Sequence, residues 1–407
     1  MEHHSNDLPW RGKCNLKYVE VREDGRININ EIEELIERYK EKVKYITITG
    51  ASNVTGYIND IRKISGLIHK YGGKIIVDGA QLVPHKKIYM YKKDSLENID
   101  FLVFSGHKIY APFGSGAIIG LRKDFNNNLP DTKGGGTVEY VIDNNQLWLN
   151  TPEKNEAGTP NLFGAVAIME AMKEIENIGF ERIEKNEKEL LQYLINGLKE
   201  LNRVKLYADN DCIDDRLGIL VFTIDGMKYY EVGEKLSEIK AIGVRQGGFC
   251  SHPYTRRVLG IPNNQLQEYI NKNGIPGLVR VSLGIYNSKK RSKRQLTHCK
   301  NSNLFLGIAG IAFAYMMATW EIKSLWDEFN KILGLVLGSL GGLFLLGMIT
   351  RKANAAGALC GIIGSIFIQL IVIQAAICTS ISYIQLLDLP LLIIGYIASW
   401  IIPGKTK

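Results

Sequence analysis

The sequence lacks the features that would place its amino-terminal part outside a reducing compartment. No C-x-x-C pair and no zinc-type spacing is found among its cysteines, which are Cys14, Cys212, Cys250, Cys299, Cys360 and Cys378. Such scattered cysteines argue against a disulfide framework and a cysteine-based metal site. The first residues also lack a basic start followed by an apolar core, so no secretory signal is expected. We therefore expect this part to be cytoplasmic and to bind no metal.

Charged residues become scarce after Asn303. Up to Pro403 the only acidic and basic residues are Glu321, Lys323, Asp327, Glu328, Lys331, Arg351, Lys352 and Asp388. A soluble domain of this size would carry about a quarter charged residues. Four apolar segments in this region are each near the length that crosses a bilayer as a helix: Leu304–Thr319, Ile332–Ile349, Ala355–Cys378 and Leu386–Ile402. The alternative is a group of buried core helices, which the short first segment and Pro390 in the fourth would suit.

The positions of the basic residues favour the membrane interpretation. The formal net charge of +8 could indicate a nucleic-acid partner, but many of the basic residues form one run at 289–294, just before the first apolar segment. This run, the Arg351-Lys352 loop and the terminal Lys405 and Lys407 lie on one side of a four-pass topology, as is typical of cytoplasmic loops. We therefore expect a multi-pass membrane tail and no nucleic-acid partner.

Up to about Ser288, short apolar runs alternate with amphipathic stretches. This alternation is typical of an α/β fold in which helices cover a parallel sheet. The pattern predicts strands at 45–49, 74–77 and 101–104, helices at 31–40 and 58–71, and two more helical stretches between 163 and 201.

The same pattern predicts the domain organisation of the 407-residue chain. We expect a large domain at 1–165, a smaller α+β domain at 166–288, a basic linker at 289–302 and the all-α membrane segment at 303–403. In open α/β sheets, ligands gather at the carboxyl ends of the strands, so the loops that follow these strands are where chemistry is expected.

Two of these strand ends carry a carboxylate and an amine. V-D-G-A-Q at 77–81 includes Asp78, and F-S-G-H-K at 104–108 includes Lys108. Pyridoxal phosphate needs a lysine to hold it as a Schiff base and a carboxylate to keep its ring nitrogen protonated. Either motif alone could instead be an ordinary turn or a surface lysine. Together they predict a pyridoxal phosphate site.

Taken in order, eight motifs resemble class V aminotransferases, and most closely the cysteine desulfurase and selenocysteine lyase group. They are E-H-H-S-N at 2–6, S-N-V-T-G at 52–56, V-D-G-A-Q at 77–81, F-S-G-H-K at 104–108, G-G-G-T at 134–137, E-A-G-T-P-N at 156–161, V-R-Q-G-G-F-C at 244–250 and R-V-S-L-G-I-Y-N at 280–287. The resemblance covers roughly residues 1–288. It implies the fold type I architecture of pyridoxal-phosphate-dependent transferases, and a homodimer.

The resemblance also implies which residues contact the cofactor. Lys108 would hold it covalently, Asp78 would pair with its ring nitrogen, and His3 would stack on the ring and shuttle protons, which suits an imidazole that titrates near neutral pH. The remaining contacts would come from polar side chains near the ring oxygen and the phosphate: Asn53, Gln81, Ser105, His107 and, from the neighbouring subunit, Thr159. Asn53 and Gln81 could equally cap loops, and His3 could belong to an unstructured terminus.

Three further residues are implied for the substrate, an amino acid similar to cysteine. Arg280 would clamp the substrate carboxylate through both guanidinium nitrogens, with Arg245 lining the same mouth. Cys250 occupies the place of the nucleophilic cysteine, whose thiolate would take the substrate sulfur as a persulfide and pass it to a sulfur acceptor protein. The alternative for Cys250 is a small buried residue.

Two departures from the family pattern shape these expectations. The family's large domain begins well upstream of its E-H-H motif, so the chain is expected to be truncated at its amino terminus, with an incomplete large domain and doubtful activity. The stretches at 324–335 and 341–358 resemble the last helices of sodium/solute symporters. A fusion of two incomplete genes would explain both departures.

Three hypotheses about function follow. The first is a cysteine desulfurase or selenocysteine lyase. The second keeps the fold and cofactor but takes another amino acid, as class V transaminases or epimerases do. The third is a membrane-embedded symporter fragment fused to an inactive enzyme remnant.

Overall fold

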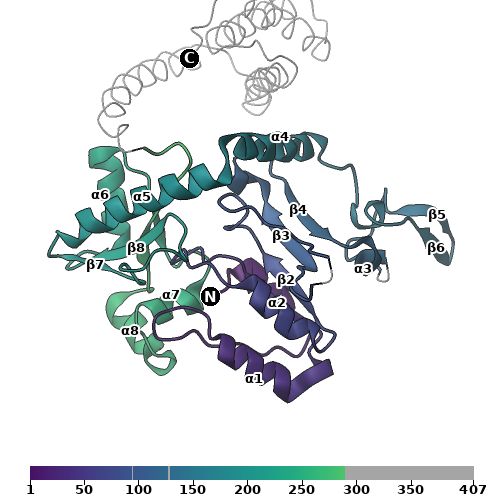
Figure 1. Ribbon diagram of the computed structural model, residues 1–407, viewed down its shortest axis with the longest axis horizontal. Coiled ribbons are helices and arrows are strands. Elements are labelled where there is room, and N and C mark those ends of the chain that lie inside the picture. Colours follow the sequence, from purple (N-terminus) through teal and green to yellow (C-terminus); the bar gives the residue numbers. More distant parts are fainter. Residues whose placement is uncertain (94, 127–128, 289–407) are drawn as a thin grey trace, which may run out of the picture. The chain divides into compact units, whose positions relative to one another are not determined.

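The computed structural model describes residues 1–288 except positions 94, 127 and 128 (Figure 1). The predicted basic linker at 289–302 and the symporter-like membrane segments predicted within 303–403 lie outside these residues. Within the described part of the chain, no helix is both long and apolar enough to cross a membrane.

A four-stranded sheet in the order β1-β2-β3-β4 forms the first part of the fold. Its strands are β1 (Tyr45–Thr49), β2 (Lys74–Asp78), β3 (Phe101–Ser105) and β4 (Gly116–Gly120). The three strands predicted from the sequence are confirmed, and they are parallel to one another. The prediction of a parallel sheet is wrong for the fourth strand, however, because β4 is antiparallel to β3. The connection from β3 to β4 is short, and a parallel crossover needs a longer one.

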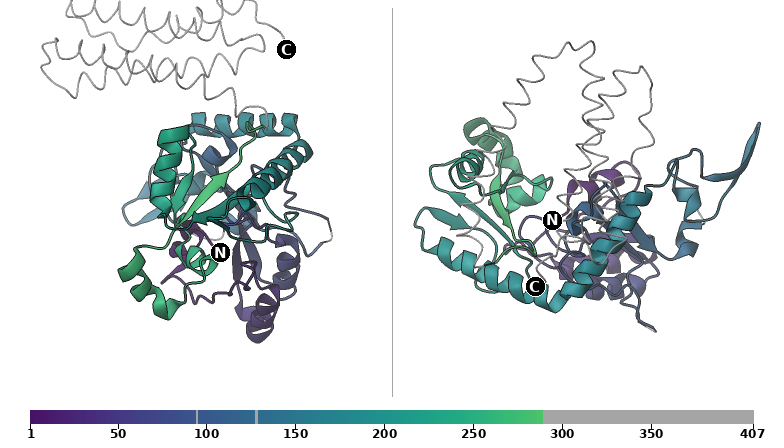
Figure 2. Two further views of the ribbon diagram at one scale, coloured as in Figure 1. Left: turned by 90° about the vertical axis from the view of Figure 1, so that its left-hand side faces the viewer. Right: turned by 90° about the horizontal axis from the view of Figure 1, so that it is seen from above.

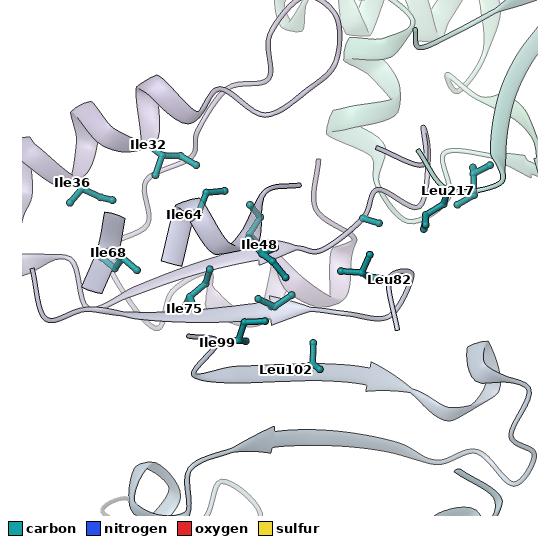
Figure 3. Close-up of a cluster of buried hydrophobic side chains, with 14 residues drawn as sticks. Ile32, Ile36, Ile48, Ile64, Ile68, Ile75, Leu82, Ile99, Leu102 and Leu217 are labelled. Atoms are coloured by element: carbon teal, nitrogen blue, oxygen red, sulfur yellow. The ribbon is translucent and has the colours of Figure 1, made fainter. Parts of the chain in front are cut away.

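The amphipathic helix α2 (Ile61–His69) packs on this sheet, and a second amphipathic helix, α1 (Ile29–Tyr39), packs against α2. Asn28 and Asp60 cap them, since each side chain accepts a backbone N–H from the first turn. Figure 3 shows the core between these helices and the strands, built mainly from isoleucine and leucine side chains: Ile32, Ile36, Ile48, Ile64, Ile68, Ile75, Leu82, Ile99, Leu102 and Leu217. Full burial of each such side chain contributes about 1.5–3 kcal/mol to stability.

The two helices predicted between 163 and 201 are confirmed as α4 (Leu162–Ile178) and α5 (Phe180–Lys199). They are separated only by Gly179, whose φ of 90° is a conformation that glycine adopts readily. α4 packs against the short helix η4 (Gly106–Ile109), directly after β3. Figure 1 shows α5 running from the end of α4 toward the second sheet.

The second sheet is antiparallel and has the order β7-β8-β10-β9. Its strands are β7 (Val204–Leu206), β8 (Ile219–Ile224), β9 (Arg245–Gly247) and β10 (Leu278–Ser282). Helices α5 and α6 (Tyr229–Lys240) pack on it over a core that contains Leu191, Ile195 and Leu220.

Short elements complete the described part of the chain. They are η1 (His4–Asn6), η2 (Leu8–Trp10), η3 (Lys40–Lys42), α3 (Arg122–Asn126), β5 (Val138–Ile142), β6 (Asn145–Trp148), η5 (Glu153–Asn155), α7 (His252–Val258), η6 (Asn263–Gln265) and α8 (Leu266–Asn273). β5 and β6 form a hairpin that projects away from the first sheet (Figure 2).

Candidate active site

The candidate carboxylate and amine lie at the ends of neighbouring parallel strands. Asp78 is the last residue of β2 and is in register with Val103 of β3, and Lys108 follows β3 in η4. Burial lowers the pKa of the Lys108 amine, while the negative charge of Asp78 raises it. The two residues thus stand at neighbouring strand ends, and the charge of Asp78 acts on the Lys108 amine.

The backbone around Asp78 is tightly held. Gly79 N–H donates to the carbonyl of Val103 at 2.7 Å, and Asp78 Oδ1 accepts the N–H of Ala80 at 3.0 Å. A Cβ atom at Gly79 would lie 2.6 Å from Leu102 Cδ1, closer than real Cβ contacts allow. A glycine after Asp78 therefore leaves room for the Leu102 side chain of β3, and the Ala80 N–H orients the carboxylate.

His3 belongs to the same group of charges. Its pKa is lowered by burial and by the nearby cation of Lys108, and raised by Asp78. The preceding residue anchors the segment, because Glu2 Oε1 accepts the N–H of Thr49 at 3.0 Å. Thr49 is in register with Asp78 across β1 and β2, so this anchor brings His3 to the strand ends.

Arg280 has an unused donor inside the protein. Its Nη1 donates to the carbonyl of Asn53 at 2.7 Å and its guanidinium lies 5.0 Å from the ring centre of Phe249. Its Nε is buried and has no hydrogen-bond partner among the described residues. Burial, and then the like charge of Arg245, lower the pKa of Arg280 to about 10. A buried guanidinium with a free donor is suited to bind a carboxylate.

Arg245 and Arg280 are paired in register across β9 and β10. Arg245 is exposed and Arg280 is half-buried. The two side chains are thus neighbours on one face of the second sheet, while their predicted roles toward the substrate stay a prediction.

Cys250 lies on the loop between β9 and α7 and is exposed. A thiolate at this position would raise the pKa of Lys108. The carbonyl of the preceding Phe249 accepts a hydrogen bond from Asn53 Nδ2 at 2.7 Å. Asn53 is buried and connects the Cys250 loop with Arg280, because its side-chain amide donates to Phe249 and its backbone carbonyl accepts from Arg280.

The remaining predicted residues lie after β2, at the end of β3 and on a separate loop. Ser105 ends β3, His107 is exposed in η4, and Gln81 is partly buried three residues after Asp78. Thr159 lies on an exposed loop next to the glycine-rich turn at 134–137, because Gly158 N–H donates to the carbonyl of Gly135 at 2.8 Å.

No role was predicted from the sequence for several residues of this region. Glu2 and His4 lie inside the E-H-H-S-N motif, yet no role was assigned to either. Ser251 and His252 follow Cys250 directly, and both contact the N-terminal segment. Glu2 and His4 lie inside one motif, and Ser251 and His252 lie just after another, but nothing in the sequence showed that these two segments meet.

The residues present fit pyridoxal phosphate. An amine with a lowered pKa, a carboxylate that interacts with it and an imidazole lie together at the strand ends, beside a buried arginine with a free donor. In the described residues, no group of three or more histidine, cysteine or acidic side chains could hold a metal ion.

The fold and this site together define a class of protein. The family profile described as aminotransferase class-V matches residues 1–293, and the chain belongs to this family. Among curated proteins, it is 32% identical over 295 residues to a probable cysteine desulfurase of Halalkalibacterium halodurans, covering 71% of this chain and 66% of that protein. It is 31% identical over 314 residues to a cysteine desulfurase of Escherichia coli O139:H28, covering 75% of this chain and 70% of that protein.

Solved structures agree with this assignment. A cysteine desulfurase from Thermococcus onnurineus NA1 is 29% identical with a TM-score of 0.62, covering 74% of this chain and 70% of that one. A cysteine desulfurase from Escherichia coli, 24% identical with a TM-score of 0.60, shares the fold over 75% of this chain and 70% of that one. The chain thus spans about two thirds of the length of these relatives.

Proposed function

We propose that this protein is a pyridoxal-phosphate-dependent cysteine desulfurase, which converts cysteine to alanine and keeps the sulfur as a persulfide on Cys250. The observation that carries the proposal is that Asp78 and Lys108 stand at the ends of the adjacent parallel strands β2 and β3, with burial lowering the pKa of the Lys108 amine. A selenocysteine substrate would use the same groups.

The cofactor would be held by residues at the ends of β2 and β3. Lys108 would bind it covalently, Asp78 would face its ring nitrogen and His3 its ring, with Gln81 and Asn53 near the ring oxygen. Ser105 and His107 would contact its phosphate, together with Thr159 from a second copy of the chain. When bound, pyridoxal phosphate supplies an electron sink for the bonds that break at the substrate.

Arg280 would bind and orient the substrate. Its unpartnered Nε and the adjacent guanidinium nitrogen present two N–H groups in a plane, which matches the two oxygens of a carboxylate. Burial strengthens this contact, because less water competes for the charge. Arg245, exposed at the mouth, would attract the anionic end of the amino acid.

Lys108 and His3 would move protons. Only the neutral amine can accept a proton, and burial favours that form because it lowers the pKa of Lys108. The pKa of His3 is also lowered by burial, so its imidazole is neutral and can accept a proton at neutral pH.

Cys250 would carry out sulfur transfer. Its thiolate attacks the sulfur of the substrate, the new S–S bond forms as the carbon–sulfur bond breaks, and the electron pair stays on the carbon. A proton delivered to that carbon completes alanine, and a thiol of an acceptor protein would then take the sulfur. The exposure of Cys250 suits this second exchange.

We also propose a homodimer. Exposed apolar side chains on the β5–β6 hairpin and at the start of α4 support it: Tyr140, Val141, Ile142, Leu147, Leu162 and Phe163. Large apolar surface that is left exposed marks interaction sites. Light scattering of the full chain in detergent, with pyridoxal phosphate present, should give twice the mass of one chain.

Absorbance and product analysis test the proposed function. The full chain incubated with pyridoxal phosphate should show the visible absorbance of a lysine-bound cofactor, which Lys108→Ala should remove and the exposed Lys123→Ala should keep. Cysteine should yield equal amounts of alanine and sulfide in the presence of a reductant. Cys250→Ser should abolish sulfide release, and Cys212→Ser, at another exposed cysteine, should not.

These measurements separate the alternatives. If Cys250→Ser releases sulfide from cysteine at the normal rate, the desulfurase mechanism through that thiol is wrong. If the cofactor-loaded wild-type chain releases no sulfide from cysteine, another amino acid becomes the better substrate candidate, as in a class V transaminase or epimerase. If the wild-type chain gives no cofactor absorbance, the enzyme part is inactive.

A further inference from the structure

The loop that carries Cys250 has a backbone conformation that must be held by its surroundings. Phe249 and Cys250 have φ values of 54° and 53°, in the left-handed region. Residues with a side chain rarely adopt this region, and two in succession are rarer still. An isolated loop of this sequence would therefore spend little time in the observed conformation.

The peptide groups on both sides of Cys250 are held by residues far away in the sequence. The carbonyl of Phe249, before Cys250, accepts from Asn53 Nδ2 at 2.7 Å. The carbonyl of Cys250 accepts from the backbone N–H of His4 at 2.7 Å. The hydroxyl of the next residue, Ser251, donates to the carbonyl of Glu2 at 2.7 Å.

His4 makes a second contact through its ring. The N–H of His252 donates to His4 Nε2 at 3.3 Å, and the two imidazole rings meet edge to face with their centres 4.5 Å apart. The backbone and the side chain of one residue thus hold the two successive peptide groups that follow Cys250. Figure 1 shows the N-terminus beside α7, which begins at His252.

We propose that His4 is a positioning residue for the nucleophile, which keeps the Cys250 loop in the conformation that presents the thiol to the site around Lys108. The inference rests on the proposed function for its catalytic consequence. The positioning itself rests only on the contacts of His4 with the loop.

The contact requires an unprotonated Nε2. A neutral imidazole with its proton on Nδ1 can accept the N–H of His252, and an imidazolium cannot. Burial, and then the neighbouring His252, lower the pKa of His4, while Asp7 raises it and Arg11 lowers it. The ring of His3, 6.4 Å away, also faces it. His4 is therefore neutral at neutral pH, and the contact is lost as the pH falls through its lowered pKa.

Two variants of His4 separate hydrogen bonding from packing. His4→Leu removes the acceptor, whereas His4→Gln keeps an acceptor oxygen near the position of Nε2. In the cofactor-free full chain, amide hydrogen exchange at His252 should become about tenfold faster in His4→Leu, the effect of losing one hydrogen bond. It should stay near the wild-type rate in His4→Gln, and exchange in α8 should be unchanged in both.

Kinetics give a second readout. With pyridoxal phosphate and cysteine, His4→Leu should lower kcat about tenfold, because a displaced thiol reacts more slowly. KM and the cofactor absorbance should not change, since Arg280 and Lys108 are untouched. His4→Gln should restore kcat.

Two outcomes would overturn the inference: unchanged exchange at His252 in His4→Leu, or a loss in His4→Gln equal to that in His4→Leu. If leucine prevents folding, His4→Asn replaces it, because this polar side chain is too short to reach the His252 amide and should behave as leucine does. A wild-type chain without desulfurase activity would refute the proposed function, while the exchange experiment would still decide whether His4 holds the loop.

Discussion

The amine of Lys108 and the carboxylate of Asp78 come from the ends of adjacent parallel strands, and the charge of Asp78 raises the pKa of the amine. Burial lowers the pKa of Lys108, and Asp78 limits that effect. The Lys108 amine is therefore half-buried and closer to its neutral, reactive form than the amine of a free lysine.

Removing the carboxylate should change the pH at which this lysine reacts. In cofactor-free Asp78→Asn the pKa of Lys108 should fall further. The substitution removes the raising effect of Asp78, while burial and the charge of Arg280 still lower the pKa. The neutral, reactive amine then dominates at lower pH. The labelling rate of Lys108 by acetic anhydride, followed by peptide mass spectrometry, should reach half its maximum at a lower pH than in the wild type. The labelling of exposed Lys123 serves as the internal reference. A higher pH of half-maximal labelling at Lys108 would contradict the effect of Asp78 on this amine.

The two arginines of β9 and β10 should differ in their effect on substrate binding. Arg280→Lys removes the planar pair of donors from a buried position, and a charged hydrogen bond contributes about 1.5–3 kcal/mol, so KM should rise roughly ten- to hundredfold. Arg245→Lys keeps an exposed cation and should change KM less than threefold, as expected for an exposed charge pair. Steady-state kinetics with cysteine measure both. Equal effects of the two substitutions would show that Arg280 is not the main contact.

The core between the first sheet and its helices should dominate the stability of this part of the chain. Ile75 is 0% exposed in β2, and Ile75→Ala should lower the free energy of unfolding by about 2–5 kcal/mol. Ile118 in β4 is 55% exposed, and Ile118→Ala should change it by less than about 0.5 kcal/mol. Urea titrations of the full chain, read by pulse proteolysis, give both values. A large loss at Ile118 would mean that another surface covers β4 in solution.

Two glycine-to-alanine substitutions should change the free energy of unfolding in opposite directions. A Cβ at Gly79 would meet Leu102, so Gly79→Ala should destabilise the protein by about 1–3 kcal/mol and weaken cofactor binding by moving Asp78. Gly197 lies inside α5 with nothing near its Cβ position, so Gly197→Ala should stabilise it by about 0.5–1 kcal/mol. The same urea titrations and a cofactor titration followed by absorbance test both. Unchanged cofactor affinity in Gly79→Ala would show that the close approach of β2 and β3 does not position Asp78.

Much of the fold could be read from local patterns. The strands at 45–49, 74–77 and 101–104 and helices α1, α2, α4 and α5 follow from hydrophobic periodicity, which depends on neighbouring residues alone. The antiparallel direction of β4 could not be read in the same way. It depends on how the chain turns after η4, and no periodicity encodes that turn.

The sequence by itself determined that Asp78 and Lys108 follow two neighbouring strands, because hydrophobic periodicity fixes those strands and the residues at their ends. Only the tertiary structure decided how Cys250 is held. Its loop is fixed by contacts with Asn53, His4 and Glu2. The contact between His4 and His252 joins residues that are 248 positions apart in the sequence. Such contacts form because folding brings distant segments together, and no local pattern specifies which segments will meet.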